Sequence, residues 1–183
     1  MAPLPSCPGT LPTAAVRKPA LQLSHASLAC IVALGDIAAA VGKGLFAGAA
    51  GTAAMTASST AEAKLRKRDA STAPAAAAGK VLGVQPRDEE GNARFSNVVH
   101  WGYGTSWGAV RGLLHAFGVD GSRAAAAHFA AVWGSEQVML PSLDVAPPLW
   151  KWGAEEVAID AWHHVVYVVA TSVAYAALNR SSS

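Results

Sequence analysis

Residues 100–112 have the sequence HWGYGTSWGAVRG, in which glycine recurs at every fourth position, at Gly104, Gly108 and Gly112. Positions four apart lie on one side of an α-helix, so this spacing lines that side with bare backbone. In water, each interior glycine costs a helix about 1 kcal/mol relative to alanine. In a bilayer, small residues let two helices approach closely and pack. The stretch therefore predicts a helix that packs against another helix inside a membrane.

A second glycine pattern lies in residues 44–61, which contain no charged side chain. Gly44 and Gly48 form another G-x-x-x-G unit, and Gly51 follows about one turn later. We expect all six glycines of the two patterns to be helix-packing residues.

The composition also favours a membrane protein. Charged residues make up 14% of the 183 residues and hydrophobic residues 52%, whereas a soluble domain is about 25% charged. Mean hydropathy is +0.28. The net charge of +2 is too small to indicate a nucleic-acid partner. The two cysteines, Cys7 and Cys30, give neither metal-ligand spacing nor a disulfide framework.

We predict an all-α, integral membrane helical bundle of about four transmembrane helices packed through GxxxG stripes. The expected spans are residues 44–63, 97–119, 124–140 and 157–178. A bilayer core of about 30 Å requires about 20 helical residues. The second and fourth spans reach this length and the other two lie near the lower limit, so three spans is the alternative.

Residues 1–42 are expected to be an N-terminal extension separate from the transmembrane domain at 43–183. The first 27 residues are rich in Pro, Ala and Ser and predict irregular structure. Residues 28–41 form a short apolar segment similar to a signal-peptide core, but Asp36 interrupts it. We expect translation to begin near Leu34.

The orientation follows from the distribution of Lys and Arg. The loop at 64–96 is strongly basic, whereas the turn between the second and third spans offers only Arg123. We therefore expect loop 64–96 to be cytoplasmic and both termini to lie outside. Within this loop, residues 74–84 predict a short helix on the membrane surface.

Charged side chains inside spans are costly and usually pair. Arg111 is the only formal charge of the second span, and Glu136 and Asp160 are the only carboxylates of the third and fourth spans. We expect Arg111 and Glu136 to form a buried charge pair, because both lie well inside their spans.

Further polar side chains recur at helical spacing on the span faces. The candidate titrating or polar site consists of His100, Tyr103, His128, Asp160, His163, His164 and Tyr167. Three interpretations remain open for these residues: hydrogen bonds that hold helices together, proton sensing or movement by imidazoles, and a metal or haem site.

The metal interpretation rests on Asp160 and His163, which have the carboxylate-x-x-His spacing of di-iron bundles. Such bundles use two of these motifs, and the chain has one. A bis-histidine haem would take His100 or His128 with His164. We expect neither metal nor cofactor, and no catalytic residue, because the chain has no nucleophile elbow, phosphate loop or H-E-x-x-H motif.

Two blocks carry a family resemblance: NVVHWGYG at residues 97–104 and GAAGTAAM at residues 48–55. With Gly108, they resemble the YagU-like bacterial inner-membrane proteins over residues 44–178. The resemblance implies a multi-pass inner-membrane location, self-association and a connection with acid tolerance. It supplies no catalytic residues.

We therefore predict a non-enzymatic inner-membrane protein, a homo-oligomer in the lipid bilayer, that contributes to envelope or acid-stress physiology through buried titratable groups. The alternative is a membrane-embedded metal- or haem-binding oxidoreductase that uses Asp160, His163 and His164. A soluble, alanine-rich helical protein is a third possibility, in which the glycine stripes would pack helices in water.

Overall fold

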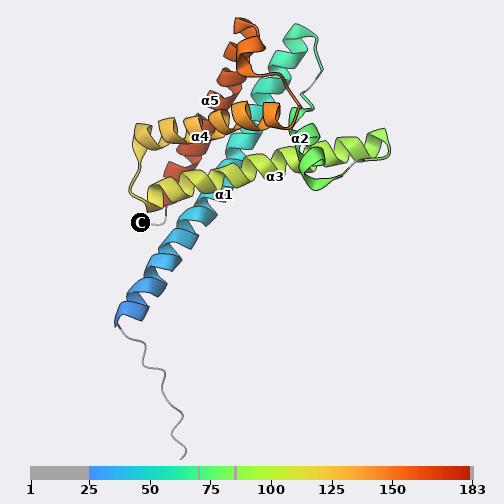
Figure 1. Cartoon of the computed structure of the whole chain (residues 1–183). Coiled ribbons are helices and arrows are strands. Elements are labelled where there is room, and N and C mark those ends of the chain that lie inside the picture. Colours follow the sequence, from blue (N-terminus) through green and yellow to red (C-terminus); the bar gives the residue numbers. More distant parts are fainter. Residues whose placement is uncertain (1–24, 70, 85, 182–183) are drawn as a thin grey trace, which may run out of the picture.

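The computed structural model describes residues 25–69, 71–84 and 86–181, and every regular element in these ranges is a helix. The helices are α1 (His25–Arg66), α2 (Ala73–Leu82), α3 (Glu89–Ala116), α4 (Gly121–Ser142), the short 3-10 helix η1 (Leu149–Lys151) and α5 (Ala154–Arg180) (Figure 1). The predicted all-helical class is confirmed.

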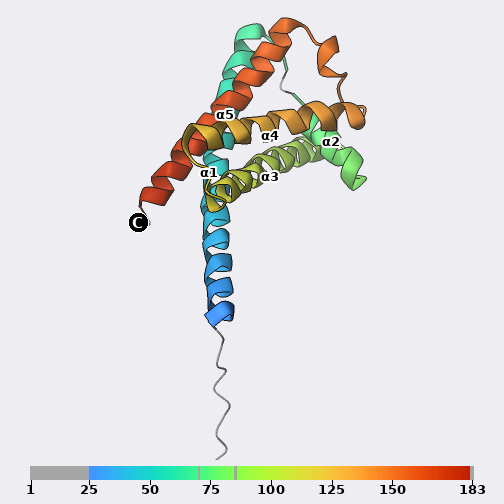
Figure 2. The same cartoon turned by 60° about the vertical axis from the view of Figure 1, so that its left-hand side comes forward.

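Helix α1 is the centre of the fold. It packs against α3 along one face and against α5 along another, and α4 lies against α5 and α3. Its N-terminal part extends beyond the other helices, while α4 runs across its direction (Figures 1 and 2).

The N-terminal boundary differs from the prediction. Helix α1 is continuous from His25 to Arg66, so the expected division between residues 42 and 43 falls inside a helix. The irregular structure expected for residues 25–27 is wrong, and that expected for residues 1–24 lies outside the described residues. Alanine explains the continuity, because it has the highest helix propensity of all residues and fills much of this segment.

The other boundaries follow from local signals. Helix α3 begins at Glu89, well before the expected residue 97, because the carboxylate of Asp88 caps it by accepting a 2.7 Å hydrogen bond from the N–H of Gly91. Helix α2 forms close to the predicted 74–84 and ends at Leu82, followed by the capping residue Gly83, whose φ of 66° suits glycine. Helix α4 extends past the expected end and includes Pro141 in its last turn.

The two glycine stripes face each other across the α1–α3 interface. A Cβ atom on Gly108 would lie 2.6 Å from the Cα of Gly48, and one on Gly48 would lie 2.6 Å from the carbonyl oxygen of Thr105. Gly44 and Gly112 meet backbone atoms of the opposite helix in the same way. The two backbones therefore approach so closely that no side chain fits between them.

Gly51 and Gly104 make room for side chains instead. A Cβ on Gly51 would collide with Tyr167 and Thr171 of α5, and one on Gly104 would collide with Thr52 of α1. All six predicted packing glycines thus lie at contacts within one chain.

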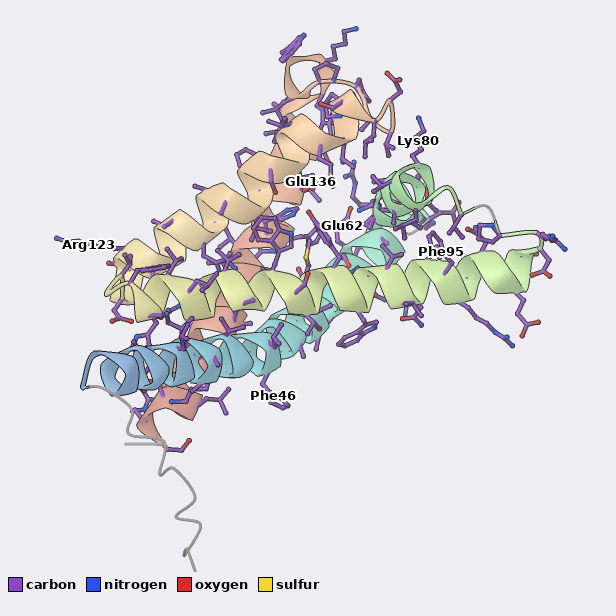
Figure 3. All side chains as sticks on the ribbon, turned by 60° about the horizontal axis from the view of Figure 1, so that its bottom comes forward. Phe46, Glu62, Lys80, Phe95, Arg123 and Glu136 are labelled. Carbon is purple, nitrogen blue, oxygen red and sulfur yellow. The ribbon has the colours of Figure 1, made fainter. Side chains whose placement is uncertain are left out.

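In the described fold, several polar side chains are buried beside alanine and a few larger apolar residues, and many large apolar side chains are exposed. Thr52, Arg111, His128 and Thr171 are buried. Large apolar side chains are exposed, and Phe46 points away from the other helices (Figure 3). Buried polar side chains and exposed apolar patches are the two features that depart from the usual pattern of a soluble protein.

Helix α5 shows both features most clearly. One face carries polar side chains against the other helices, and the opposite face exposes Trp162, Val165, Val169 and Val173. By length and composition, two helical segments are apolar enough to cross a membrane: Ala33–Arg66 of α1 and Ala154–Arg180. Helices α3 and α4 do not meet the same hydropathy criterion.

Candidate functional site

A row of polar side chains on α5 organises the interior. It consists of Asp160, His164, Tyr167, Thr171 and Tyr175, which recur three or four residues apart and therefore share one face. The last four of these residues are buried, Tyr167 with 2% and Thr171 with 0% of its surface exposed. Glu136 of α4 lies at one end of the row and Arg111 of α3 at the other.

At the first end, His164 lies between two carboxylates. Its Nε2 atom is 2.8 Å from Oε2 of Glu136 on α4. Its Nδ1 atom is 2.9 Å from the backbone carbonyl oxygen of Asp160 and 3.7 Å from Oδ1 of the same residue. The Asp160 carboxylate is held by Trp133, whose indole N–H donates a 2.8 Å hydrogen bond to Oδ2.

These contacts indicate which ring nitrogen of His164 carries a proton. Because a carbonyl oxygen only accepts, Nδ1 carries the proton of the bond to Asp160. A neutral ring would then present the lone pair of Nε2 to the Glu136 carboxylate, which is itself only an acceptor when ionised. The 2.8 Å approach is therefore favourable only when one of the two atoms carries a proton or when a metal ion lies between them.

His163 lies apart from this cluster. Its Nδ1 atom is 3.0 Å from the hydroxyl of Ser58, and its Nε2 atom is 3.7 Å from Glu62, both on α1. Successive residues of a helix point about 100° apart, so His163 and His164 face different neighbours. The expected grouping of Asp160, His163 and His164 is corrected: Glu136 takes the place of His163.

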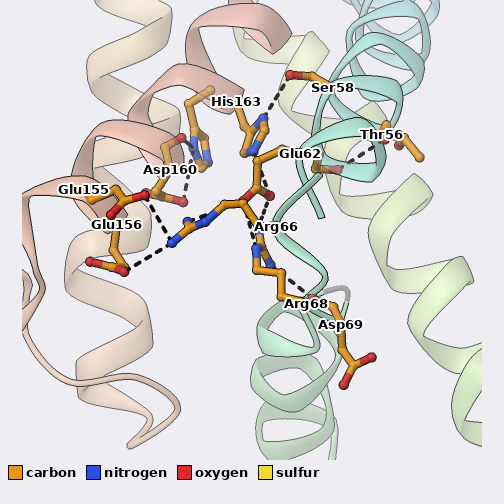
Figure 4. A network of polar contacts seen from close by, with 12 residues as sticks. Thr56, Ser58, Glu62, Arg66, Arg68, Asp69, Glu155, Glu156, Asp160 and His163 are labelled. Carbon is orange, nitrogen blue, oxygen red and sulfur yellow. Dashed lines mark hydrogen bonds and ion pairs between the residues drawn. The ribbon is translucent and has the colours of Figure 1, made fainter. Parts of the chain in front are cut away.

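Glu62 connects His163 to a surface network of ion pairs (Figure 4). It pairs with Arg66 and Arg68, and Arg66 also lies 3.3 Å from Glu155 and 3.7 Å from Glu156 at the start of α5. The Glu62 carboxylate raises the pKa of the Arg68 guanidinium above its usual value through a hydrogen bond. The network joins the end of α1 to the beginning of α5.

The expected pair of Arg111 and Glu136 does not form. Arg111 lies near the turn between α3 and α4, whereas Glu136 lies toward the far end of α4. Two antiparallel helices joined by a short turn pair residues at similar distances from that turn, so these two side chains sit at different levels. Arg111 instead approaches Asp120, with 3.9 Å between Nη2 and Oδ1, and stacks over the Tyr175 ring at 4.5 Å.

The middle of the row holds α3 and α4 together. The Tyr167 hydroxyl donates a 2.6 Å hydrogen bond to the carbonyl oxygen of Gly104. The Nε2 atom of His128 is 3.0 Å from the carbonyl oxygen of Trp107, and the His128 ring packs beside that of Tyr167. His128 is completely buried, and both of its contacts are structural.

The remaining predicted residues lie outside this row. His100 is 2.7 Å from the hydroxyl of Thr56 and joins α3 to α1. Tyr103 is exposed, with its ring against Trp107. The haem interpretation pairs His100 or His128 with His164. Each of these three histidines contacts a different partner, and no contact among the described residues brings either pair together.

One group of side chains has metal-ligand chemistry. Glu136, Asp160 and His164 each offer one donor atom, and these atoms lie within 4.8 Å of one another. Carboxylate and imidazole donors suit several divalent cations, so these three residues could hold such an ion in place of a proton.

Sequence reasoning missed Glu62, Asp120, Trp133 and Tyr175. Tyr175 had a usable signal, because it continues the i, i+4 spacing from Thr171. The other three lie on loops or helix faces whose partners are set by the tertiary arrangement. Comparison of the chain with family models, curated proteins and solved structures finds no match.

Proposed function

We propose that this chain is a multi-pass protein of the bacterial inner membrane, with spans in α1, α3, α4 and α5. The observation that supports this most strongly is the distribution of side chains around α5. The exposed face of α5 is formed by Trp162, Val165, Val169 and Val173, and the buried face by histidine, threonine and tyrosine with Val168. Lipid is the solvent that favours such an arrangement, since apolar side chains then face hydrocarbon and polar groups satisfy one another.

The positions of the basic residues support an orientation. Arg66 and Arg68 lie at one end of the α1–α5 pair, beside the start of loop 64–96, and the α3–α4 turn lies at the other end. The loop is the most basic part of the chain, which favours a cytoplasmic position. Two helices meet the hydropathy criterion on their own; in this proposal α3 and α4 cross beside them, with their polar groups turned inward.

Alkaline carbonate washing of native membranes tests this location. An integral protein stays with the bilayer, whereas a soluble or peripheral protein is released. Recovery of the native chain in the carbonate supernatant, or in the soluble fraction without detergent, would reject the proposal.

The proposed role is non-enzymatic, a contribution to envelope or acid-stress physiology through the His164–Glu136 pair. A proton shared by these residues turns two facing acceptors into an ion pair. Asp160 and His163 are the neighbouring titratable groups on α5, and Glu62 reaches His163 from α1. Acidification would therefore tighten the contact between α4 and α5, and loss of the proton would loosen it.

Thermal unfolding in detergent between about pH 5 and about pH 8, the range in which imidazole titrates, tests the pair. The unmodified protein should lose stability as the pH rises. Glu136→Gln should flatten the profile, because its amide can donate to Nε2 of a neutral His164. Glu90→Gln, at an exposed position of α3, is the matched control. Identical pH profiles for Glu136→Gln and the unmodified protein would reject the role of the pair.

The second candidate is the membrane-embedded metal- or haem-binding oxidoreductase, and the convergence of Glu136, Asp160 and His164 favours its metal form. It predicts a stoichiometric metal or a visible chromophore in the purified protein. Elemental analysis and an absorption spectrum distinguish it from the proton-binding role, which needs neither.

Self-association remains part of the proposal, but it needs a surface other than the glycine stripes. Those glycines are covered by α1, α3 and α5 of the same chain, so they cannot also pack a second copy.

A further inference from the structure

The most poorly satisfied charge among the described residues is Arg111. It is 4% exposed, and its Nε and Nη1 atoms have no hydrogen-bond partner. Its nearest carboxylate, Asp120, is 3.9 Å away and already lies 2.7 Å from His115. A buried guanidinium with unused donors is costly unless an anion pairs with it.

Arg111 lines a pocket of about 480 Å³ formed by α3, α4 and α5. The buried hydroxyl groups of Ser172 and Tyr175 have no hydrogen-bond partner either, and both residues line the same pocket. Three side chains therefore bring unused hydrogen-bond donors to one cavity.

The electrostatics of this pocket favour an anion. Arg180 adds a second positive charge to the lining. Gly121 and Ser122, the first residues of α4, also line it. The carboxylate of Asp120 makes no capping hydrogen bond to α4, so the positive end of the helix dipole faces the cavity without one. Asp120 is the one opposing charge, and His115 and Arg111 flank it.

Apart from Asn179, the rest of the lining is apolar. Val169 and Val173 line the pocket and belong to the exposed apolar face of α5. The cavity therefore continues directly from a polar floor onto a surface suited to hydrocarbon. A ligand that fits both parts has an anionic head and an apolar tail.

We propose that this pocket binds an oxyanion head group of the phosphate class, held by Arg111, Ser172 and Tyr175, with an attached acyl chain against Val169 and Val173. The planar guanidinium suits such a group because it can donate two parallel hydrogen bonds to its oxygens. The acyl part rests on the membrane location proposed above, whereas the phosphate part does not.

Binding to the full-length protein in neutral detergent tests the proposal, with three probes: inorganic phosphate, short-chain phosphatidylglycerol and short-chain phosphatidylcholine. Native mass spectrometry and thermal unfolding serve as readouts. Phosphatidylglycerol should bind and raise the unfolding temperature, and phosphatidylcholine should do so at least about tenfold more weakly. Stabilisation by phosphate as well would show that the head group suffices; stabilisation by phosphatidylglycerol alone would assign the ligand to the lipid.

Variants locate the site. Arg111→Gln should reduce phosphatidylglycerol affinity by about tenfold or more. The double variant Ser172→Ala with Tyr175→Phe removes two unused hydroxyls while preserving packing, so it keeps the test decisive if Arg111→Gln does not fold. Arg94→Gln, at an exposed site on α3, is the charge-matched control. Equal binding by the double variant and the unmodified protein, or binding of neither anionic probe, would overturn the proposal.

Discussion

Tyr167 and Gly104 connect α5 to α3 through a single hydrogen bond, 2.6 Å from the phenolic oxygen to the backbone carbonyl oxygen. Gly104 lets α3 approach Thr52 of α1, and Gly51 of α1 makes room for the buried Tyr167. Three helices therefore meet at this contact, and two glycines make it possible.

Replacing Tyr167 by Phe should lower the free energy of unfolding by about 1 kcal/mol, because the ring packing remains and one buried hydrogen bond is lost. Tyr103→Phe is the control, since Tyr103 is exposed and should change stability little. Both variants can be measured by unfolding in the same detergent. Equal stability of Tyr167→Phe and the unmodified protein would mean that the bond contributes nothing.

Gly108→Ala should destabilise the protein by about 2 kcal/mol, because the added methyl group must force α3 away from α1. Gly102 lies on the same helix, and a Cβ there meets nothing within 4 Å. Gly102→Ala should therefore be neutral or stabilise by up to about 1 kcal/mol through helix propensity. The opposite ranking of the two variants would contradict the α1–α3 interface.

Introducing a charged residue on the exposed face of α5 tests whether lipid or water surrounds this face. Val169 is 54% exposed, so Val169→Arg would be tolerated in a soluble protein. In a membrane it should cost about 3 kcal/mol on insertion scales and reduce membrane abundance. Ala177→Arg, close to the helix end at Arg180, should be accepted because its side chain reaches the interface. Equal abundance of the two variants would argue against lipid contact at Val169.

Cysteine labelling tests the four-span topology. In a chain with Cys7 and Cys30 replaced by serine, Leu65→Cys should react with an impermeant thiol reagent only after the cytoplasmic side is opened. Phe117→Cys should react from the outside. Both positions are exposed, so burial does not limit either reaction. Labelling of both cysteines from one side would rule out a crossing by α3.

The sequence predicted which glycines lie at helix contacts, because positions four apart share a face whatever the partner is. It did not reveal that Gly108 meets Gly44 and Gly48, since spacing within one helix says nothing of the helix opposite. The glycine stripes, through which self-association was expected, are therefore covered by other helices of the same chain.

The polar site was predicted less completely, for a related reason. The prediction paired Arg111 with Glu136 because their charges are opposite, and it took no account of their positions along the helices. In the structure, Arg111 approaches Asp120 and Glu136 approaches His164. His163 and His164 are adjacent in the sequence, yet they face α1 and α4 respectively. Pairing between helices depends on crossing geometry, which hydropathy and spacing do not encode.

The close fit of α1 against α3 restricts how this molecule can move. Where the two backbones are in direct contact, no flexible side chain can rearrange to allow one helix to slide or rotate against the other. We therefore expect α1 and α3 to move together as one rigid unit. Helix α4 is held instead by side chains that can rearrange, among them His128 and Glu136. Any opening of the interior should therefore occur by displacement of α4, with α1 and α3 as the fixed frame.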